Sequence, residues 1–228
     1  MTRRITALTK EGFRGIQSGH YTNAVLSFRH AIQCLKEREE LWQVRHKNDM
    51  QDDDEVDSYD LAIRNVPIGF SETNVARERS PHNVFEVYDS AFMFPCTTET
   101  PAASYEMSIV LCYNLALAHH LAGLCGVENS TKHFQEALKY YKLSLTVFRS
   151  RSSFYFDDWY ALVLGILTNM GFIFCHCWQR NEARTCSEHI DKLLSSPAVL
   201  ELSDKDGEFF FSTLTHSKDF HAQIAPAA

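Results

Sequence analysis

The sequence lacks long apolar runs and a basic excess. A membrane-spanning helix needs about 20 consecutive apolar residues, but the two most apolar stretches, 109–124 and 162–177, are interrupted by asparagine and histidine. The formal net charge is −7 and the basic residues are scattered, whereas a surface that binds nucleic-acid phosphates needs a local basic excess. We therefore expect a protein that neither spans a membrane nor binds nucleic acid.

A secretory signal is also missing from the pattern of the first residues. No apolar region follows the basic pair Arg3-Arg4, and a signal peptide would need one. The seven cysteines are an odd number, which fits free thiols in a reducing compartment better than a disulfide framework. These features predict a cytoplasmic or nuclear protein.

The common catalytic and metal-binding motifs are absent as well. The sequence has no Gly-x-Ser-x-Gly elbow, no phosphate-binding glycine-rich loop and no His-Glu-x-x-His. The run Cys175-His176-Cys177 is the best metal candidate. Neighbouring residues on a helix point about 100° apart, so its two thiols would not easily share one ion. We expect a non-enzymatic protein with no cofactor and no metal.

The sequence does contain enough hydrophobic residues to form one core. Hydrophobic residues make up 45% of the 228 residues and aromatic residues 12%, which is enough apolar surface for a single domain over residues 1–228. Its helical segments show apolar residues at three- and four-residue spacing, typical of helices that pack on one side. The predicted helices span 3–18, 22–41, 104–123, 131–149, 158–178 and 180–195.

A pair of small residues recurs in three of these helical regions. The pairs are Gly12 with Ala24, Ala116 with Ala137, and Gly171 with Ala183. Members of the first and third pairs are 12 residues apart and those of the second are 21 apart, so nine extra residues fall between its helices. We place them in the turn formers of 123–130. A small residue on one helix lets the next approach closely, which predicts three helix-turn-helix units over 1–41, 104–150 and 157–196.

These units resemble the tetratricopeptide-repeat (TPR) family. Asn114-Leu115-Ala116 and Asn169-Met170-Gly171 are similar to the Asn-Leu-Gly stretch in the first helix of such a repeat, although Ser187 and Ile190 depart from the pattern in the third unit. The resemblance implies a mainly α fold, a short right-handed array of helix pairs. The residues on the family's signature positions are Gly12, Gly19, Tyr21, Ala24, Phe28, Ala31, Ala116, Ala137, Tyr141, Gly171 and Ala183.

The resemblance also implies a function and two site residues. TPR proteins bind other proteins in a concave groove, where the Asn of the Asn-Leu-Gly stretch hydrogen-bonds the backbone of an extended peptide. Asn114 and Asn169 match that position, although an asparagine bonded to the neighbouring helix is an equal alternative. Some members hold a chaperone C-terminal tail with a clamp of two Lys, two Asn and an Arg, of which only Asn114 coincides here. The other clamp positions are Thr9, Phe13, Gly165 and Asn169. None is basic, so we do not expect that partner.

The insertion at 42–103 and the tail at 197–228 lie outside the repeats. An acidic run at 49–57 should repel itself, and two β-like pieces at 63–70 and 84–94 could pair as an antiparallel hairpin packed on the helices. If this hairpin lay in the groove, the protein would be self-blocked or would bind elsewhere. The apolar stretch 207–214 would either add a strand or cover the last helix pair.

We therefore expect an interaction scaffold that binds a segment of another protein, and two rivals stay open. One is a metal- or redox-linked regulator that uses Cys175, His176 and Cys177. The other is a self-assembling structural protein, a homo-oligomer whose contact comes from aromatic residues of the insertion and the tail. These residues are Phe85, Phe92, Phe94, Phe209, Phe210 and Phe211.

Overall fold

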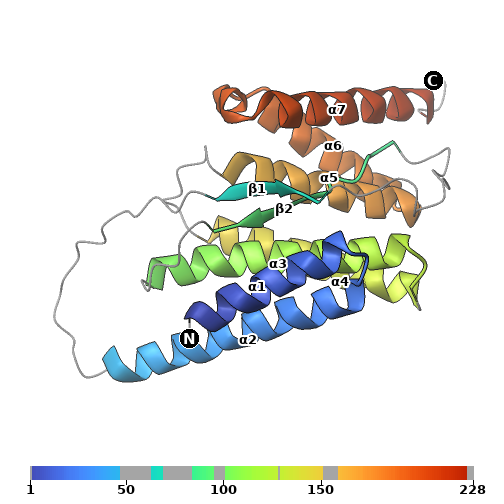
Figure 1. The fold of residues 1–228 in the computed structure, drawn as a ribbon. Coiled ribbons are helices and arrows are strands. Elements are labelled where there is room, and N and C mark those ends of the chain that lie inside the picture. The colour runs from blue at the N-terminus through green and yellow to red at the C-terminus, as the bar shows by residue number, and fades with distance from the viewer. Residues whose placement is uncertain are drawn as a thin grey trace. The chain divides into compact units, whose positions relative to one another are not determined.

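The protein is mainly α-helical with one small two-stranded antiparallel sheet (Figure 1). The computed structural model describes residues 2–46, 63–68, 84–94, 101–127, 129–150 and 159–224. The chain divides into two compact units. The first comprises 1–68 and 91–150, and the second comprises 69–90 and 151–228.

Helices α1 (Thr2–Gln17) and α2 (Tyr21–His46) begin the first unit and pack against each other. A Cβ added at Gly12 would lie 2.6 Å from the ring of Phe28, and one at Gly15 would lie 3.0 Å from Ala24. The two glycines therefore let α2 approach α1 more closely than any larger residue would allow. Tyr21, Ala24, Phe28 and Ala31 are all buried on the facing side.

Helices α3 (Pro101–Leu124) and α4 (Ser130–Arg149) form the next packed pair, and α2 also packs on α3. Ala116, Ala137 and Tyr141 are fully buried. Only residues 125–129 lie between the two helices, so most of the nine extra residues lengthen the helices and do not enlarge the turn as predicted. Close approach near this turn comes from Gly123, where an added Cβ would lie 2.8 Å from the ring of Phe134.

The predicted hairpin is present as strands β1 (Arg64–Pro67) and β2 (Ser90–Met93). The division between the units falls at Ser90, and the rest of the sheet belongs to the first unit. Because β2 supplies buried Ala91 and Phe92, this small sheet is part of the core of that unit.

The second unit contains α5 (Tyr160–His176), α6 (Arg180–Leu194), a short 3₁₀ helix η2 (Pro197–Glu201) and α7 (Asp204–Ile224). We expected the stretch 207–214 either to add a strand or to cover the last helix pair. In the structure it is helical. It lies within α7, which packs on α6 and α5. A buried Ser187–Ser217 hydrogen bond of 2.7 Å joins α6 to α7. A Lys218–Asp191 ion pair of 2.7 Å joins the same two helices at the surface.

Helices α1, α3 and α5 end in the same way. The second residue after the helix end is left-handed, with φ of 74° at Gly19, 66° at Gly126 and 59° at Trp178. In each case the amide of this residue and the next amide bond back to carbonyls of the last helical turn, as from His20 to Gly15 at 2.8 Å and from Gln179 to Phe174 at 2.8 Å. This is the Schellman motif, so one turn geometry recurs at all three helix ends.

The six predicted helices correspond to α1 to α6, but α2 continues to His46 instead of ending at residue 41, and α7 was not predicted as a helix. Ser104 does not begin the third helix, since α3 starts at Pro101. Instead its hydroxyl accepts a hydrogen bond from Arg38 of α2. Asp157 and Asp158, which as acidic residues before the fifth predicted helix could cap it, lie outside the described residues. The acidic run 49–57 and the final residues 225–228 also lie outside them.

One helix among the described residues is long and apolar enough to cross a membrane. It is the 104–124 part of α3, and 89% of its most apolar window is buried inside the protein. A helix that the fold itself covers to this extent has the character of a core helix.

Candidate functional site

Asn114 lies in the middle of α3 and is fully buried. Its side-chain oxygen accepts a hydrogen bond from the backbone N–H of Phe92 at 3.1 Å. Its side-chain nitrogen donates to the backbone C=O of the same residue at 2.8 Å. One amide side chain therefore pairs with both polar groups of one residue in β2.

Asn169 makes the corresponding pair of bonds in the second unit. It lies in α5 and is fully buried. Its oxygen accepts from the backbone N–H of Tyr88 at 2.8 Å, and its nitrogen donates to the C=O of Tyr88 at 3.1 Å. We call residues 84–94 the inner segment, and each of these two asparagines holds one of its residues by the backbone.

The chemistry of these contacts explains why asparagine suits both positions. A carboxamide offers an acceptor and a donor on one plane, which matches the donor and acceptor of a peptide unit. A carboxylate could not donate, and a charged group would cost more to bury. Such a contact recognises the peptide backbone and is independent of the side chain of the bound residue.

Around Phe92 the first unit supplies mainly aromatic packing. The Phe92 ring is 1% exposed and meets Tyr113 edge-on, with centroids 5.1 Å apart and planes at 75°. Tyr113 in turn packs on Tyr141 of α4 at 5.8 Å. The backbone of Phe92 is thus fixed by Asn114 and its ring by an aromatic layer between α3 and α4.

Around Tyr88 the second unit supplies a pocket with a polar end. The Tyr88 ring, 3% exposed, packs against Phe209 and Phe210 of α7 with centroid distances of 5.4 and 4.8 Å. Its hydroxyl donates a hydrogen bond to Asp206 Oδ1 at 2.9 Å. The Ser203 hydroxyl donates to the other oxygen of Asp206 at 2.6 Å and accepts from the Asp206 N–H at 3.2 Å. This reciprocal pairing at the start of a helix fixes the carboxylate that receives the hydroxyl.

Gly171 creates a second slot beside that pocket. A Cβ added there would lie 2.5 Å from the ring of Phe85, and the three nearest atoms all belong to that ring. We predicted that Gly171 would let the next helix approach closely, as Gly12 does. In the structure, the Phe85 ring of the inner segment occupies the space above Gly171 instead. Phe85 is 2% exposed.

The cysteine and histidine cluster has no arrangement that suggests a metal or redox centre. Burial raises the pKa of the Cys175 thiol to about 11, although the backbone of Val84 partly offsets this increase. Burial also raises the pKa of Cys177, and a raised pKa keeps a thiol in its less reactive neutral form. His176 stacks on Phe172. Among the residues with described positions, no group of three or more His, Cys, Asp or Glu side chains could hold a metal ion.

Most of the aromatic residues proposed for self-assembly are used inside the units. Phe85, Phe92 and Phe210 are buried, while Phe94 and Phe209 are partly buried. Phe211 is 48% exposed. The apolar surface that this set leaves for another molecule is therefore small.

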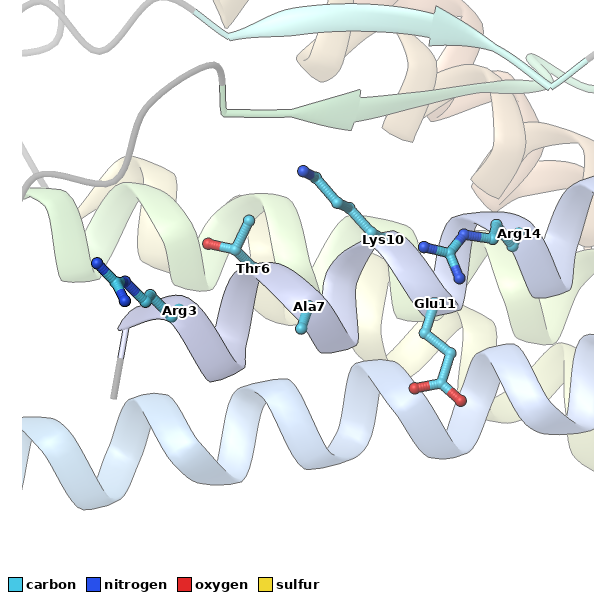
Figure 2. Close-up of a pocket in the computed structure, with 6 residues that line it drawn as sticks. All are labelled: Arg3, Thr6, Ala7, Lys10, Glu11 and Arg14. Carbon is cyan, nitrogen blue, oxygen red and sulfur yellow. The ribbon is translucent and has the colours of Figure 1, made fainter.

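An open hollow lies along α1 in the first unit. Figure 2 shows six described lining residues, all from this helix, with Lys10 and Glu11 pointing to opposite sides. Arg3, Lys10 and Arg14 give the hollow a local positive charge that we did not predict, although their spacing on one helix was visible in the sequence. Asn114 and Asn169 are not among these described lining residues.

Tyr88, Ser203 and Asp206 are the residues of the site that sequence reasoning missed. The spacing of Ser203 and Asp206 is that of a capping box, which would have indicated the start of α7. Tyr88 carried no comparable local signal, because its partners lie 81 and 118 residues away along the chain.

Comparison with known proteins adds no further assignment. No protein-family model, no curated protein and no solved structure matches this chain.

Proposed function

We propose that this is a non-enzymatic, TPR-like interaction protein that binds an extended segment of another protein through Asn114 and Asn169. The observation that carries the proposal is the pair of hydrogen bonds that each asparagine makes with the backbone of one residue. This is the contact that peptide binding needs, and here the inner segment of the same chain provides the peptide.

The recurring helix ends support the proposal of a repeat array. Gly12 precedes the left-handed Gly19 by seven residues, and Gly171 precedes the left-handed Trp178 by seven residues. The small residues Ala24, Ala116, Ala137 and Ala183 are fully buried. In a TPR array the first helix of each pair lines the concave face, and Asn114 and Asn169 each lie on the first helix of a pair in their own unit.

The chemistry of the site favours a backbone ligand over a charged one. Neither asparagine carries a charge, and the contacts at Phe92 and Tyr88 are hydrogen bonds and aromatic packing. A chaperone C-terminal tail would need cations at Thr9, Phe13 or Gly165. We propose a protein partner in the cytoplasm or nucleus, and neither a nucleic acid nor a membrane.

The two rival functions find less support. A homo-oligomer built on the aromatic residues would have to use side chains that already pack within their own units. A regulator built on Cys175, His176 and Cys177 would rely on thiols whose pKa values are raised. Light scattering at high concentration and metal analysis of the purified protein would test these alternatives directly.

A peptide library screened against the full chain tests the proposed function. Peptides selected on the wild-type protein should lose affinity by about tenfold or more when Asn114→Ala or Asn169→Ala removes two hydrogen bonds. Asn23→Ala and Asn181→Ala are matched controls, because both residues are exposed asparagines on other helices. Equal binding to all four variants would show that the asparagines are not the binding site.

A further inference from the structure

The inner segment is a ligand that the protein already holds, so its contacts describe the ligand that the site accepts. Within the second unit it contributes three contacts. Asn169 binds the backbone of Tyr88, the space above Gly171 receives the Phe85 ring, and Asp206 binds the Tyr88 hydroxyl. The backbone contact suits any sequence, whereas the other two select particular side chains.

We propose that the second unit binds an extended partner segment with phenylalanine three residues before tyrosine, and that this Phe-x-x-Tyr segment replaces residues 84–90. The inference rests on the proposed function, because it assumes that the Asn169 site can hold a peptide from another chain. It goes further in naming the side chains of that peptide and the part of the chain that competes with it.

The phenylalanine requirement follows from the slot above Gly171. The absence of a side chain at this position brings the aromatic ring so close that a single added carbon would lie 2.5 Å from it. A smaller residue in place of Phe85 would leave part of the slot empty, and unfilled apolar space is costly. A flat ring of this size is therefore the group that the slot selects.

The tyrosine requirement follows from Asp206. Its carboxylate is fixed by Ser203 and accepts the Tyr88 hydroxyl at 2.9 Å. A phenylalanine at this place would fill the space between Phe209 and Phe210 but leave the carboxylate without that donor. A phosphotyrosine would bring about −2 charges next to the partly buried Asp206 carboxylate. The pocket therefore selects unmodified tyrosine over both.

A partner segment can replace residues 84–90 because the contacts that hold them, hydrogen bonds and packing, are non-covalent and reversible. Residues 84–89 belong to no helix or strand. A tethered segment competes at an effective concentration of about millimolar. A free peptide of the same sequence would therefore displace it only at about millimolar concentration, and a partner has to bind more tightly than the inner segment does.

A fluorescent peptide with the sequence of residues 84–92 tests the proposal in the full-length chain. Phe85→Ala with Tyr88→Ala weakens the competing segment, so the peptide should bind this double variant at least tenfold more tightly than the wild type. Adding Asn169→Ala to the double variant should abolish the gain, and adding the surface change Asn181→Ala should preserve it. Equal affinity for the wild type and the double variant would overturn the proposal.

Two altered peptides test the side-chain requirement. On the double variant, a peptide with phenylalanine in place of tyrosine should bind about tenfold more weakly, and a phosphotyrosine peptide should not bind measurably. Asp206→Asn should reduce the difference in affinity between the tyrosine peptide and the phenylalanine peptide, since it removes the charge from the acceptor. Equal binding of all three peptides to the double variant would refute selection by Asp206.

Failure of this inference can be separated from failure of the proposed function. If library peptides bind through Asn114 and Asn169 but contain no Phe-x-x-Tyr, the function stands and the inference is wrong. If no peptide depends on either asparagine, the function itself is wrong.

Hydrogen exchange of the wild-type protein decides the matter if the double variant does not fold. The Tyr88 amide should exchange through local release, with protection at least tenfold below that of the α5 core amides and little dependence on denaturant. Exchange of Tyr88 only together with α5, by global unfolding, would show that the segment is a permanent part of the core and would overturn the proposal.

Discussion

The two asparagine contacts use the same chemistry in different surroundings. Asn114 holds a residue of β2, whose chain is also paired with β1. Asn169 holds Tyr88, which lies outside any strand and whose side chain is fixed by α7. In the first unit the sheet shares the task of positioning the bound backbone, whereas in the second the side-chain pockets do so. If the proposed function is correct, the second unit should therefore be the more selective for the sequence of its ligand.

Removing the amides should have the largest effect and should act separately on the two contacts. Asn114→Ala or Asn169→Ala would leave a buried N–H and a buried C=O without that partner, at a cost of about 2–4 kcal/mol in the free energy of unfolding. Urea unfolding of each variant against Asn23→Ala measures this. A cost below about 0.5 kcal/mol would mean that water or another group replaces the amide easily.

Adding one carbon to either glycine should distinguish the two kinds of packing. Gly171→Ala should destabilise the protein by about 1–3 kcal/mol, because the new Cβ would meet the Phe85 ring. The same change at Gly12 should also destabilise, but through Phe28 of α2.

Replacing the ring that meets the new Cβ by a smaller side chain should relieve the clash, and so identifies the ring against which each glycine packs. Phe85→Leu should recover part of the loss caused by Gly171→Ala and none of the loss caused by Gly12→Ala. Recovery in both backgrounds, or in neither, would contradict these assignments.

Acid should weaken the first unit through His119, a buried histidine that contacts the partly buried His133. His119 lies 3.0 Å from His133, Nδ1 to Nδ1. Burial, followed by the charges of Arg29, His133 and Lys139, lowers the pKa of His119 from 6.5 to about 4. The unfolded chain binds this proton more readily, so stability should fall as the pH drops from about 6.5 to about 4, by about 2 kcal/mol.

Unfolding curves at several pH values measure this effect. His119→Gln should flatten the pH dependence, and His216→Gln, at an exposed position of α7, should not. An unchanged pH profile of His119→Gln would show that other groups control the acid response.

The smallest effect should come from the helix ends. Trp178 has a left-handed φ of 59° where the corresponding helix ends have Gly19 and Gly126. This conformation costs a non-glycine residue about 1–2 kcal/mol, partly offset by Arg180, which lies 5.6 Å from the ring. Trp178→Gly should therefore raise the melting temperature slightly, while Gly19→Ala should lower it. A lower melting temperature for Trp178→Gly would mean that the exposed indole contributes more packing than its position suggests.

The role of Asn114 and Asn169 in peptide binding, which came from the family resemblance, stays a prediction. Local patterns were enough to predict helices α1 to α6, whereas α7 was left open. Their apolar spacing and small-residue pairs are short-range signals, as is the turn at Gly19. The content of the site was not predictable in this way, because Tyr88 meets Asn169 and Asp206 only after folding brings distant segments together. The aromatic run at 209–211 did not by itself decide between a strand and a helix. The capping pair Ser203 and Asp206 would have favoured the helix.

Amide hydrogen exchange of Tyr88 and Phe92 in single-asparagine variants tests the central claim most directly. If each asparagine holds the backbone N–H and C=O of one residue, Asn169→Ala should speed exchange at Tyr88 by at least tenfold and leave Phe92 nearly unchanged, and Asn114→Ala should do the reverse. Unchanged rates at both amides in both variants would contradict the claim that these side chains bind the backbone of an extended segment.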